Sequence, residues 1–201
     1  IDSLNCAHTA ASTGPDALAI SYEADNFNTM RSSSGAPTDC VGAGLKSTSV
    51  SVTTTAGIST STTIYVASPV YNIDTSNTPR TLSCSNVDGV ATLQPLIENV
   101  IDMQVTYGTG TKLSPTYILG YLSAQEIDNP AGPVTGLASA ADRWALVRTV
   151  RVCILVSSHE PVATSANAAQ YRNCNGTVVT NPPDLKLRRA YTTTVVLRNR
   201  G

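Results

Sequence analysis

The run Ser157-Ser158-His159-Glu160 holds the residue types that hydrolytic chemistry needs: a nucleophile, a base and a carboxylate. A catalytic triad requires these groups to converge from separate structural elements, so consecutive residues do not form one. The run is therefore interpreted as a polar loop that follows a strand. A hydrolase is a hypothesis that requires a pocket in which His159 meets a serine and an acid.

Acidic residues are the second group suited to chemistry, either as acid–base catalysts or as Ca²⁺ ligands. The candidates are Glu98, Asp102, Glu126 and Asp128. They form no calcium-loop motif of the type D-x-[DN]-x-[DN]-G, and no pair has a diagnostic spacing. The chain has two histidines and no C-x-x-C motif, which gives little support to a zinc site. We therefore predict no catalytic, metal-binding or cofactor-binding residue, and leave open a calcium site assembled from distant loops.

The composition is that of a weakly charged chain with one domain. Its 201 residues are enough to bury a core, and we expect residues 16–201 to form a single globular domain after a tether at residues 1–15. The formal net charge of −1 indicates neither a nucleic-acid partner nor an anionic membrane. Charged residues make up 13%, as is common in secreted β-rich proteins and in subunits that pack into polymers.

Five cysteines, Cys6, Cys40, Cys84, Cys153 and Cys174, are scattered along the chain. This usage fits an oxidising compartment with two disulfides and one unpaired thiol. The sequence does not select among the possible pairings. Position along the chain favours Cys153–Cys174, which ties a strand to the loop after it, and Cys40–Cys84, which closes the first β region. Cys6 is then the unpaired candidate, and each bridge contributes about 2–4 kcal/mol.

Residues 94–107 change their hydrophobic period partway through. The first apolar residues recur at the spacing of one helical turn: Leu96, Ile97, Val100 and Ile101. Later apolar residues alternate with polar ones: Ile101, Met103, Val105 and Tyr107. Pro95 stands where a first helical turn tolerates proline. The segment therefore predicts a short helical turn that leads directly into a half-buried strand.

Most of the remaining pattern is typical of strands. Alternating or Thr-rich runs predict strands at residues 16–23, 46–55, 62–71 and 81–87. Gly57 indicates a hairpin between the second and third of these, with Val50 pointing inward. Short helices are predicted from the capping-box residue Ser123 to Asn129 and at residues 138–143. The predicted class is α+β, mainly β.

The strongest strand signal begins at Trp144 and ends at Val156, where even-numbered positions form a long apolar face interrupted by Arg148. A polar excursion over residues 158–184 follows, and then a Thr/Val-rich strand over residues 187–200. Four arginines make this last segment basic: Arg188, Arg189, Arg198 and Arg200. They indicate either a docking surface for an acidic neighbour or the protection of an edge strand by charge, and both interpretations stay open.

Two long motifs resemble the PilW family of type IV pilus minor pilins. The first is Q-P-L-[VI]-E-G-V-x-D-[ML]-Q-V-x-Y-G, matched by Gln94, Pro95, Glu98, Asp102 and Tyr107, with Asn99 where the family more often has Gly. The second is the closing strand R-R-x-[FY]-x-[ST]-T-V-x-L-R-N-R, matched by Arg188, Arg189, Leu197, Arg198, Asn199 and Arg200. Residues 16–23, 150–155 and 171–174 resemble further parts of that family, so the resemblance covers about residues 16–200.

This resemblance implies a pilin-like or pseudopilin-like head with antiparallel sheets and short helices. The resemblance implies an N-terminal apolar helix and a cleaved leader before Ile1, and we therefore expect this chain to be a trimmed form. The implied role is a non-enzymatic minor pilin that helps to initiate the pilus in a tip or priming complex. That role is similar to the one of the J-type minor pseudopilin of type II secretion.

The resemblance also implies partners and a location. The implied partners are other minor pilins, the major pilin and a PilY-type tip adhesin, with membrane contact only through the missing helix. The subunit is expected in the inner membrane, facing the periplasm, and then outside the cell near the pilus tip. The alternative function is a secreted or tip-located adhesin that binds a surface ligand through residues 26–44 and 158–184.

Overall fold

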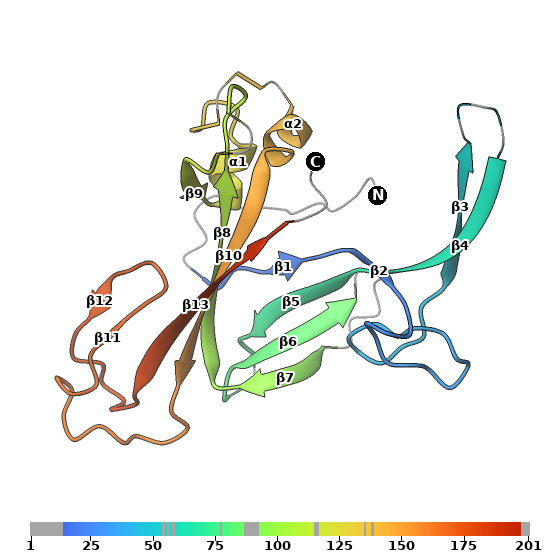
Figure 1. Ribbon diagram of the computed structural model, residues 1–201. Coiled ribbons are helices and arrows are strands. Elements are labelled where there is room, and N and C mark those ends of the chain that lie inside the picture. Colours follow the sequence, from blue (N-terminus) through green and yellow to red (C-terminus); the bar gives the residue numbers. More distant parts are fainter. Residues whose placement is uncertain are drawn as a thin grey trace. The chain divides into compact units, whose positions relative to one another are not determined.

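The computed structural model describes residues 14–53, 55, 57, 59–76, 78–86, 93–114, 117–134, 136–137 and 139–197 (Figure 1). Its contacts divide the chain into two compact units. The N-terminal unit is Ala17–Glu98, and the C-terminal unit combines Ile1–Asp16 with Asn99–Gly201. Antiparallel sheets dominate, which confirms the predicted mainly β class. None of the helices that the structure describes is long and apolar enough to cross a bilayer.

The N-terminal unit contains two antiparallel sheets. One has the order β1-β5-β6-β7, with strands Leu18–Ala19, Pro69–Asp74, Thr81–Asn86 and Gln94–Glu98. The other has the order β2-β4-β3, with strands Tyr22–Ala24, Ser59–Ala67 and Ser47–Thr53. Two predicted strands are thus each divided between the sheets: residues 16–23 form β1 and β2, and residues 62–71 form parts of β4 and β5. Alternation continues across both breaks, so periodicity alone does not reveal them.

The hairpin predicted around Gly57 is confirmed, with β3 paired to β4 and Gly57 in the left-handed region at φ 76°. The inward direction predicted for Val50 is wrong, because its side chain is exposed. Val50 lies opposite Thr62, and the strand alternates with Ser and Thr. The residue directly opposite is therefore polar and offers this valine no apolar partner.

The helical turn predicted at the start of residues 94–107 is also wrong. Residues 94–98 form β7, the outer strand of its sheet, and all five side chains are exposed. Pro95 is compatible with this place because an outer strand leaves one row of N–H groups unpaired. Asn99 follows with a left-handed φ of 62°, and the chain then enters β8. The residues with helical spacing belong to two strands, Leu96 and Ile97 to β7 and Val100 and Ile101 to β8.

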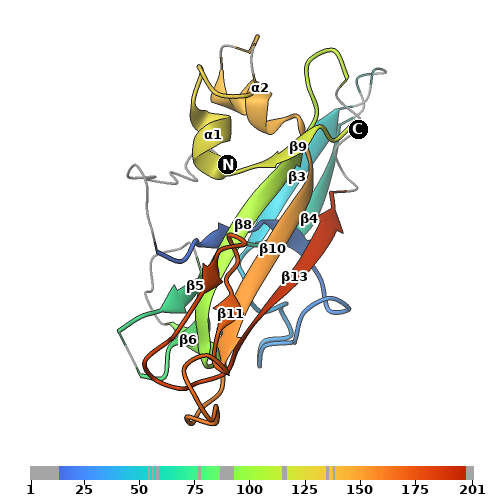
Figure 2. The ribbon, with the colours of Figure 1, turned by 90° about the vertical axis from the view of Figure 1, so that its left-hand side faces the viewer.

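The main sheet of the C-terminal unit has the order β13-β10-β8-β9 (Figure 2). Its strands are Arg188–Val196, Val147–Ser157, Val100–Thr109 and Gly120–Leu122. A short hairpin of β11 (Tyr171–Arg172) and β12 (Val178–Val179) interrupts the predicted polar excursion. Both long strands predicted for this part of the chain are present, but β10 begins at Val147 and not at Trp144, which ends a short helix. The more buried side of β10 is the odd-numbered one: Val147, Thr149, Cys153 and Leu155.

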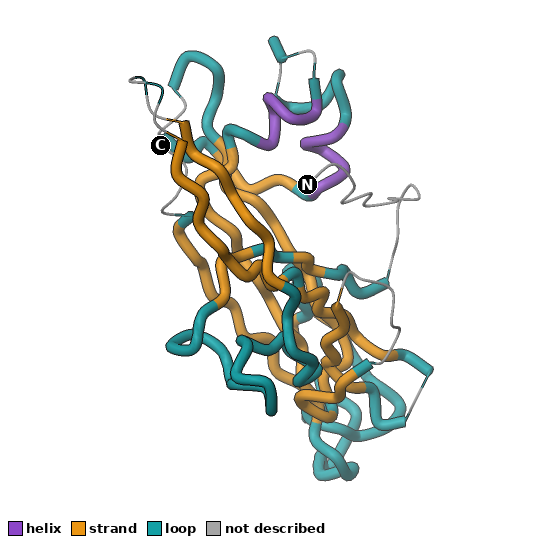
Figure 3. The backbone as a smooth tube through the Cα atoms, turned by 90° about the vertical axis from the view of Figure 1, so that its right-hand side faces the viewer, coloured by secondary structure: helices purple, strands orange, loops and turns teal. Residues whose placement is uncertain are grey.

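Two short helices, α1 (Ala124–Asp128) and α2 (Ala140–Trp144), lie side by side next to this sheet (Figure 3). Both were predicted, and Ser123 forms the expected capping box with Glu126. Arg143 is only 3% exposed and joins the helices. Its guanidinium donates hydrogen bonds to the backbone carbonyls of Ile127, Asp128 and Leu137 at 2.5, 2.6 and 3.1 Å. This single side chain therefore satisfies carbonyl groups that the end of α1 leaves unpaired.

Candidate functional site

Each unit contains one disulfide, and both pairings are those that the sequence favoured. Cys40 is bonded to Cys84 in the N-terminal unit, with 6.3 Å between their Cα atoms. Cys153 of β10 is bonded to Cys174, with 5.7 Å between their Cα atoms. The second bridge fixes the loop after β11 against the main sheet. Cys6, the unpaired candidate, lies outside the described residues.

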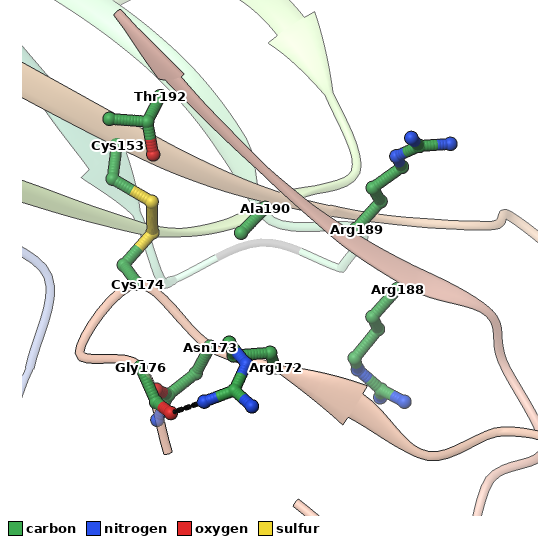
Figure 4. Close-up of a pocket in the computed structure, with 9 residues that line it drawn as sticks. All are labelled: Cys153, Arg172, Asn173, Cys174, Gly176, Arg188, Arg189, Ala190 and Thr192. Carbon is green, nitrogen blue, oxygen red and sulfur yellow. Dashed lines mark hydrogen bonds between the residues drawn. A yellow bond between two sulfur atoms is a disulfide. The ribbon is translucent and has the colours of Figure 1, made fainter. Parts of the chain in front are cut away.

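A shallow pocket of about 430 Å³ lies beside the second disulfide (Figure 4). Its polar lining includes Arg172, Asn173, Arg188 and Thr192. In Figure 4 the side chain of Arg189 points away from the Arg172 and Arg188 side chains. The pocket is therefore basic through two guanidinium groups that come from β11 and from the start of β13.

The two guanidinium groups differ in their partners. Arg188 forms a two-pronged ion pair with Asp184, with 2.9 Å between Nη1 and Oδ1, and it also lies over the ring of Tyr171. Arg172 donates to the backbone carbonyl of Gly176, a neutral group. Hydrogen bonds from Arg188 hold the pKa of Asp184 at about 2. The positive charge of Arg188 is thus largely compensated, whereas the exposed Arg172, which also lines the pocket, donates to a neutral group.

The Asp184–Arg188 pair predicts a dependence of stability on acid. The folded-state pKa of Asp184 is depressed from 3.8 to about 2, so its contribution is present above pH 3.8 and is lost as the pH falls through 2. Because the Asp184 side chain is 39% exposed, screening limits that contribution to about 1 kcal/mol or less. We expect Asp184→Asn to lower the urea midpoint at pH 7. Between pH 4 and pH 2 the urea midpoint of this variant should fall less steeply with decreasing pH than that of the parent. An equally steep fall of the urea midpoint in the two proteins would contradict this expectation.

Six apolar side chains line one side of β10 and β13, and we call them the β10–β13 face: Val150, Val152, Ile154, Val156, Tyr191 and Val195. Register places Val150 opposite Val195 and Ile154 opposite Tyr191. The residues on β10 are half-buried, while Tyr191 and Val195 on the outer strand are 53% and 52% exposed. Register also places Thr193 opposite Val152 and Arg189 opposite Val156 on this side. The face is therefore an apolar strip that is open along β13 and bordered by one charged side chain, as is typical of an interaction surface.

The geometry around His159 does not resemble a hydrolytic site. Its Nε2 atom lies 3.4 Å from the carboxylate of Glu160, and both side chains are exposed. The Ser158 hydroxyl donates to the backbone carbonyl of Glu160 at 2.7 Å, so its proton is not directed at the imidazole. The described residues also contain no group of three or more His, Cys, Asp or Glu side chains that would hold a metal ion.

The structure divides the motif residues between the two units. Gln94, Pro95 and Glu98 lie on β7 of the N-terminal unit. The described motif residues of the C-terminal unit are Asp102 and Tyr107 on β8, Arg188 and Arg189 on β13, and Leu197 just after it. Tyr107 packs edge-on against Trp144 with 4.8 Å between ring centroids. Arg198, Asn199 and Arg200 lie outside the described residues.

Several residues that shape this region have no signal in the sequence. Arg143 looks like an ordinary charged residue on a short helix, and Asp184 looks like a loop carboxylate. Arg151 interrupts no pattern, yet its guanidinium lies 3.4 Å from the centroid of the Tyr121 ring. Only contacts between distant segments give these side chains their roles.

Comparison with known proteins gives one family. The profile of the family described as Type IV Pilus-assembly protein W (PilW) matches residues 70–199. The match begins within β5 and includes every strand of the main sheet of the C-terminal unit, together with the β10–β13 face and the basic pocket. No curated protein and no solved structure matches the chain.

Proposed function

The chain belongs to the type IV pilus-assembly protein W family, and on that premise we propose that it is a minor pilin that helps to initiate the pilus within a tip or priming complex. Membership of this family indicates that the chain takes part in type IV pilus assembly. Its position at the tip of the filament and its part in initiation are our proposal. The observation that carries it is the open β10–β13 face, which lies inside the matched residues.

The role of this face would be to bury apolar surface against another subunit. Covering a half-exposed aliphatic or aromatic side chain stabilises a complex by about 1 kcal/mol, so six of them contribute on the order of 5 kcal/mol before the cost of association. The disulfide of Cys153 and the buried Arg143 hold the sheet and its helices in place. A rigid face loses little conformational entropy when it docks.

The partners we propose are other minor pilins, the major pilin and a PilY-type tip adhesin. The subunit would face the periplasm before assembly and lie outside the cell, near the tip, afterwards. We propose no catalytic function, because Ser158, His159 and Glu160 lack the geometry of a nucleophile and its base. The proposal is therefore one of mechanical assembly through complementary surfaces.

Deletion of the gene tests this function directly. We expect the deletion strain to lose nearly all surface pili while the cellular amount of major pilin stays unchanged, because initiation and not subunit supply is removed. Electron microscopy and quantification of sheared pili measure the first quantity, and immunoblotting measures the second. Complementation with the parent gene is the control. Normal piliation in the deletion strain would refute the proposal.

A second candidate function, adhesion, is favoured by an apolar loop in the N-terminal unit. Phe27 is 98% exposed and Met30 is 79% exposed. Asp25 nevertheless orders this loop, since its carboxylate accepts hydrogen bonds from the backbone N–H groups of Phe27 and Asn28 at 2.7 and 2.9 Å. An ordered loop that presents two large apolar side chains fits a surface ligand.

The adhesion candidate predicts a phenotype separate from assembly. Replacing Phe27 and Met30 by alanine should leave surface pili normal but reduce cell attachment several-fold, because only the loop contact is removed. Attachment to epithelial cells and to abiotic surfaces, normalised to the pilus count, measures the effect. A matched change elsewhere in the same unit, Leu93→Ala, is the control. Unchanged attachment would remove this candidate.

A further inference from the structure

The outer edge of β13 is free along most of its length. β13 is an outer strand of its sheet, and within the described ranges no strand pairs with its second edge. At its two ends, Leu197 donates to the carbonyl of Arg148 and Leu187 accepts from Ser158, both on the β10 side. Because antiparallel residues alternate between the two sides of a strand, Thr192, Thr194 and Val196 direct their backbone N–H and C=O groups away from β10.

Between Ala190 and Val196 this edge lacks the charges, prolines and bulges that usually protect an outer strand. The pairing of β13 with β10 runs without a register shift from Arg188 to Val196, so no bulge turns the edge away. The stretch Ala190–Val196 contains no charged residue and no proline. Its Thr and Val residues favour extended backbone. Such an edge is a template for one more strand.

Charge decides what kind of strand fits. The basic pocket lies at the start of the free edge, where Thr192 contributes to its lining and Arg172 provides a guanidinium whose hydrogen-bond partner is a neutral carbonyl. A second copy of β13 carries its own Arg188 and Arg189, and so would add positive charge to an edge whose pocket is already basic. Like charges would then oppose self-pairing, whereas an acidic segment would be attracted.

We propose that the outer edge of β13, together with the basic pocket, binds an extended acidic segment of another polypeptide. The segment adds to the sheet as an antiparallel strand beyond Thr192–Val196 and places a carboxylate beside Arg172. This site uses the edge of the strand and is separate from the β10–β13 face. It rests on the proposed function in one respect, namely that an assembly subunit has protein partners.

A synthetic peptide tests the proposal with this chain as it stands. The probe is a nine-residue peptide of alternating Thr and Val with two C-terminal glutamates, which an antiparallel strand brings to the pocket. We expect it to slow hydrogen exchange at the amides of Thr192, Thr194 and Val196, whose N–H groups gain partners. The same peptide with two lysines should bind about tenfold more weakly or worse. Equal binding of the two peptides, or no change at the three amides, would overturn the proposal.

Two variants of the chain test whether peptide binding requires the edge of β13 and Arg172. Thr194→Pro removes one outward N–H at an outer-strand position where proline is tolerated, and should abolish binding. Arg172→Glu should reduce the affinity of the glutamate peptide about tenfold, whereas Arg31→Glu, with the same change of charge in the other unit, should not. If Thr194→Pro fails to fold, the comparison of Arg172→Glu with Arg31→Glu remains as the test. Equal affinities of these two variants for the glutamate peptide would refute the proposed site. Pilus counts are not part of this assay, so its failure and a failure of the assembly proposal are distinguishable.

Discussion

Replacing Tyr191 and Val195 by glutamate should reduce surface piliation nearly to the level of the deletion strain. Both side chains lie on the outer strand of the main sheet and are about half exposed, so the folded chain accommodates the change. Docking of the β10–β13 face would instead bury two carboxylates, of which the one at position 195 lies opposite Val150, and this costs several kcal/mol, on the order of a hundredfold or more in affinity. The measurement is the number of pili per cell, together with circular dichroism and urea unfolding of the purified variant.

Val162→Glu is the matched control, because Val162 is 57% exposed and lies in the same unit outside the β10–β13 face. It adds one negative charge, against two in the Tyr191→Glu/Val195→Glu variant, and should leave piliation normal. A folded Tyr191→Glu/Val195→Glu variant with normal pili would show that the face does not take part in assembly. If the deletion strain lost its pili but this variant had normal pili, the proposed part in pilus initiation would stand. Only the assignment of that part to the β10–β13 face would be refuted.

The parts of the fold that the sequence predicts are those with local causes. The capping box at Ser123 forms because a side chain and a backbone group three residues apart satisfy each other. The hairpin at Gly57 forms because the turn needs a left-handed residue. The long strands β10 and β13 carry long runs rich in Val, Ile and Thr. Each of these signals lies within a few residues of the structure it predicts.

The parts that the sequence does not predict depend on neighbours that are distant along the chain. Periodicity shows that β10 has an apolar side, but not that this side is the more open one, because that depends on what covers each face. The segment at Pro95 has helical spacing and yet pairs with β6, since pairing with a distant strand overrides a local period. The β10–β13 face could thus be predicted as apolar, whereas its exposure could not.

In the candidate site, too, the sequence predicts some features and not those that depend on residues distant along the chain. Position along the chain favoured the two observed cysteine pairs, although the sequence alone did not select them. The basic pocket could not be predicted, since Arg172 and Arg188 are brought together by a loop that folds back on β13. Nor does the sequence show that Asp184 compensates the charge of Arg188 while Arg172 donates to a neutral carbonyl.

Replacing Arg143 by methionine should produce the largest loss of stability of any single change considered. The side chain is buried and donates to the carbonyls of Ile127, Asp128 and Leu137. Methionine fills a similar volume but has no donor, so these carbonyls lose their partners inside the helix pair. Leaving buried acceptors unsatisfied costs about 1–3 kcal/mol each before relaxation, and we expect a total of about 3–5 kcal/mol.

Urea unfolding followed by tryptophan fluorescence measures this effect, because Trp144, the only tryptophan, lies beside Arg143 and donates from Nε1 to Asp128. Arg143→Lys should recover little, since an ammonium group lacks the planar fork that reaches several carbonyls at once. Arg151→Met is the control; it removes a guanidinium stacked over Tyr121 and should cost about 1 kcal/mol or less. If Arg143→Met and Arg151→Met were equally stable, the buried guanidinium would not be what joins α1 to α2.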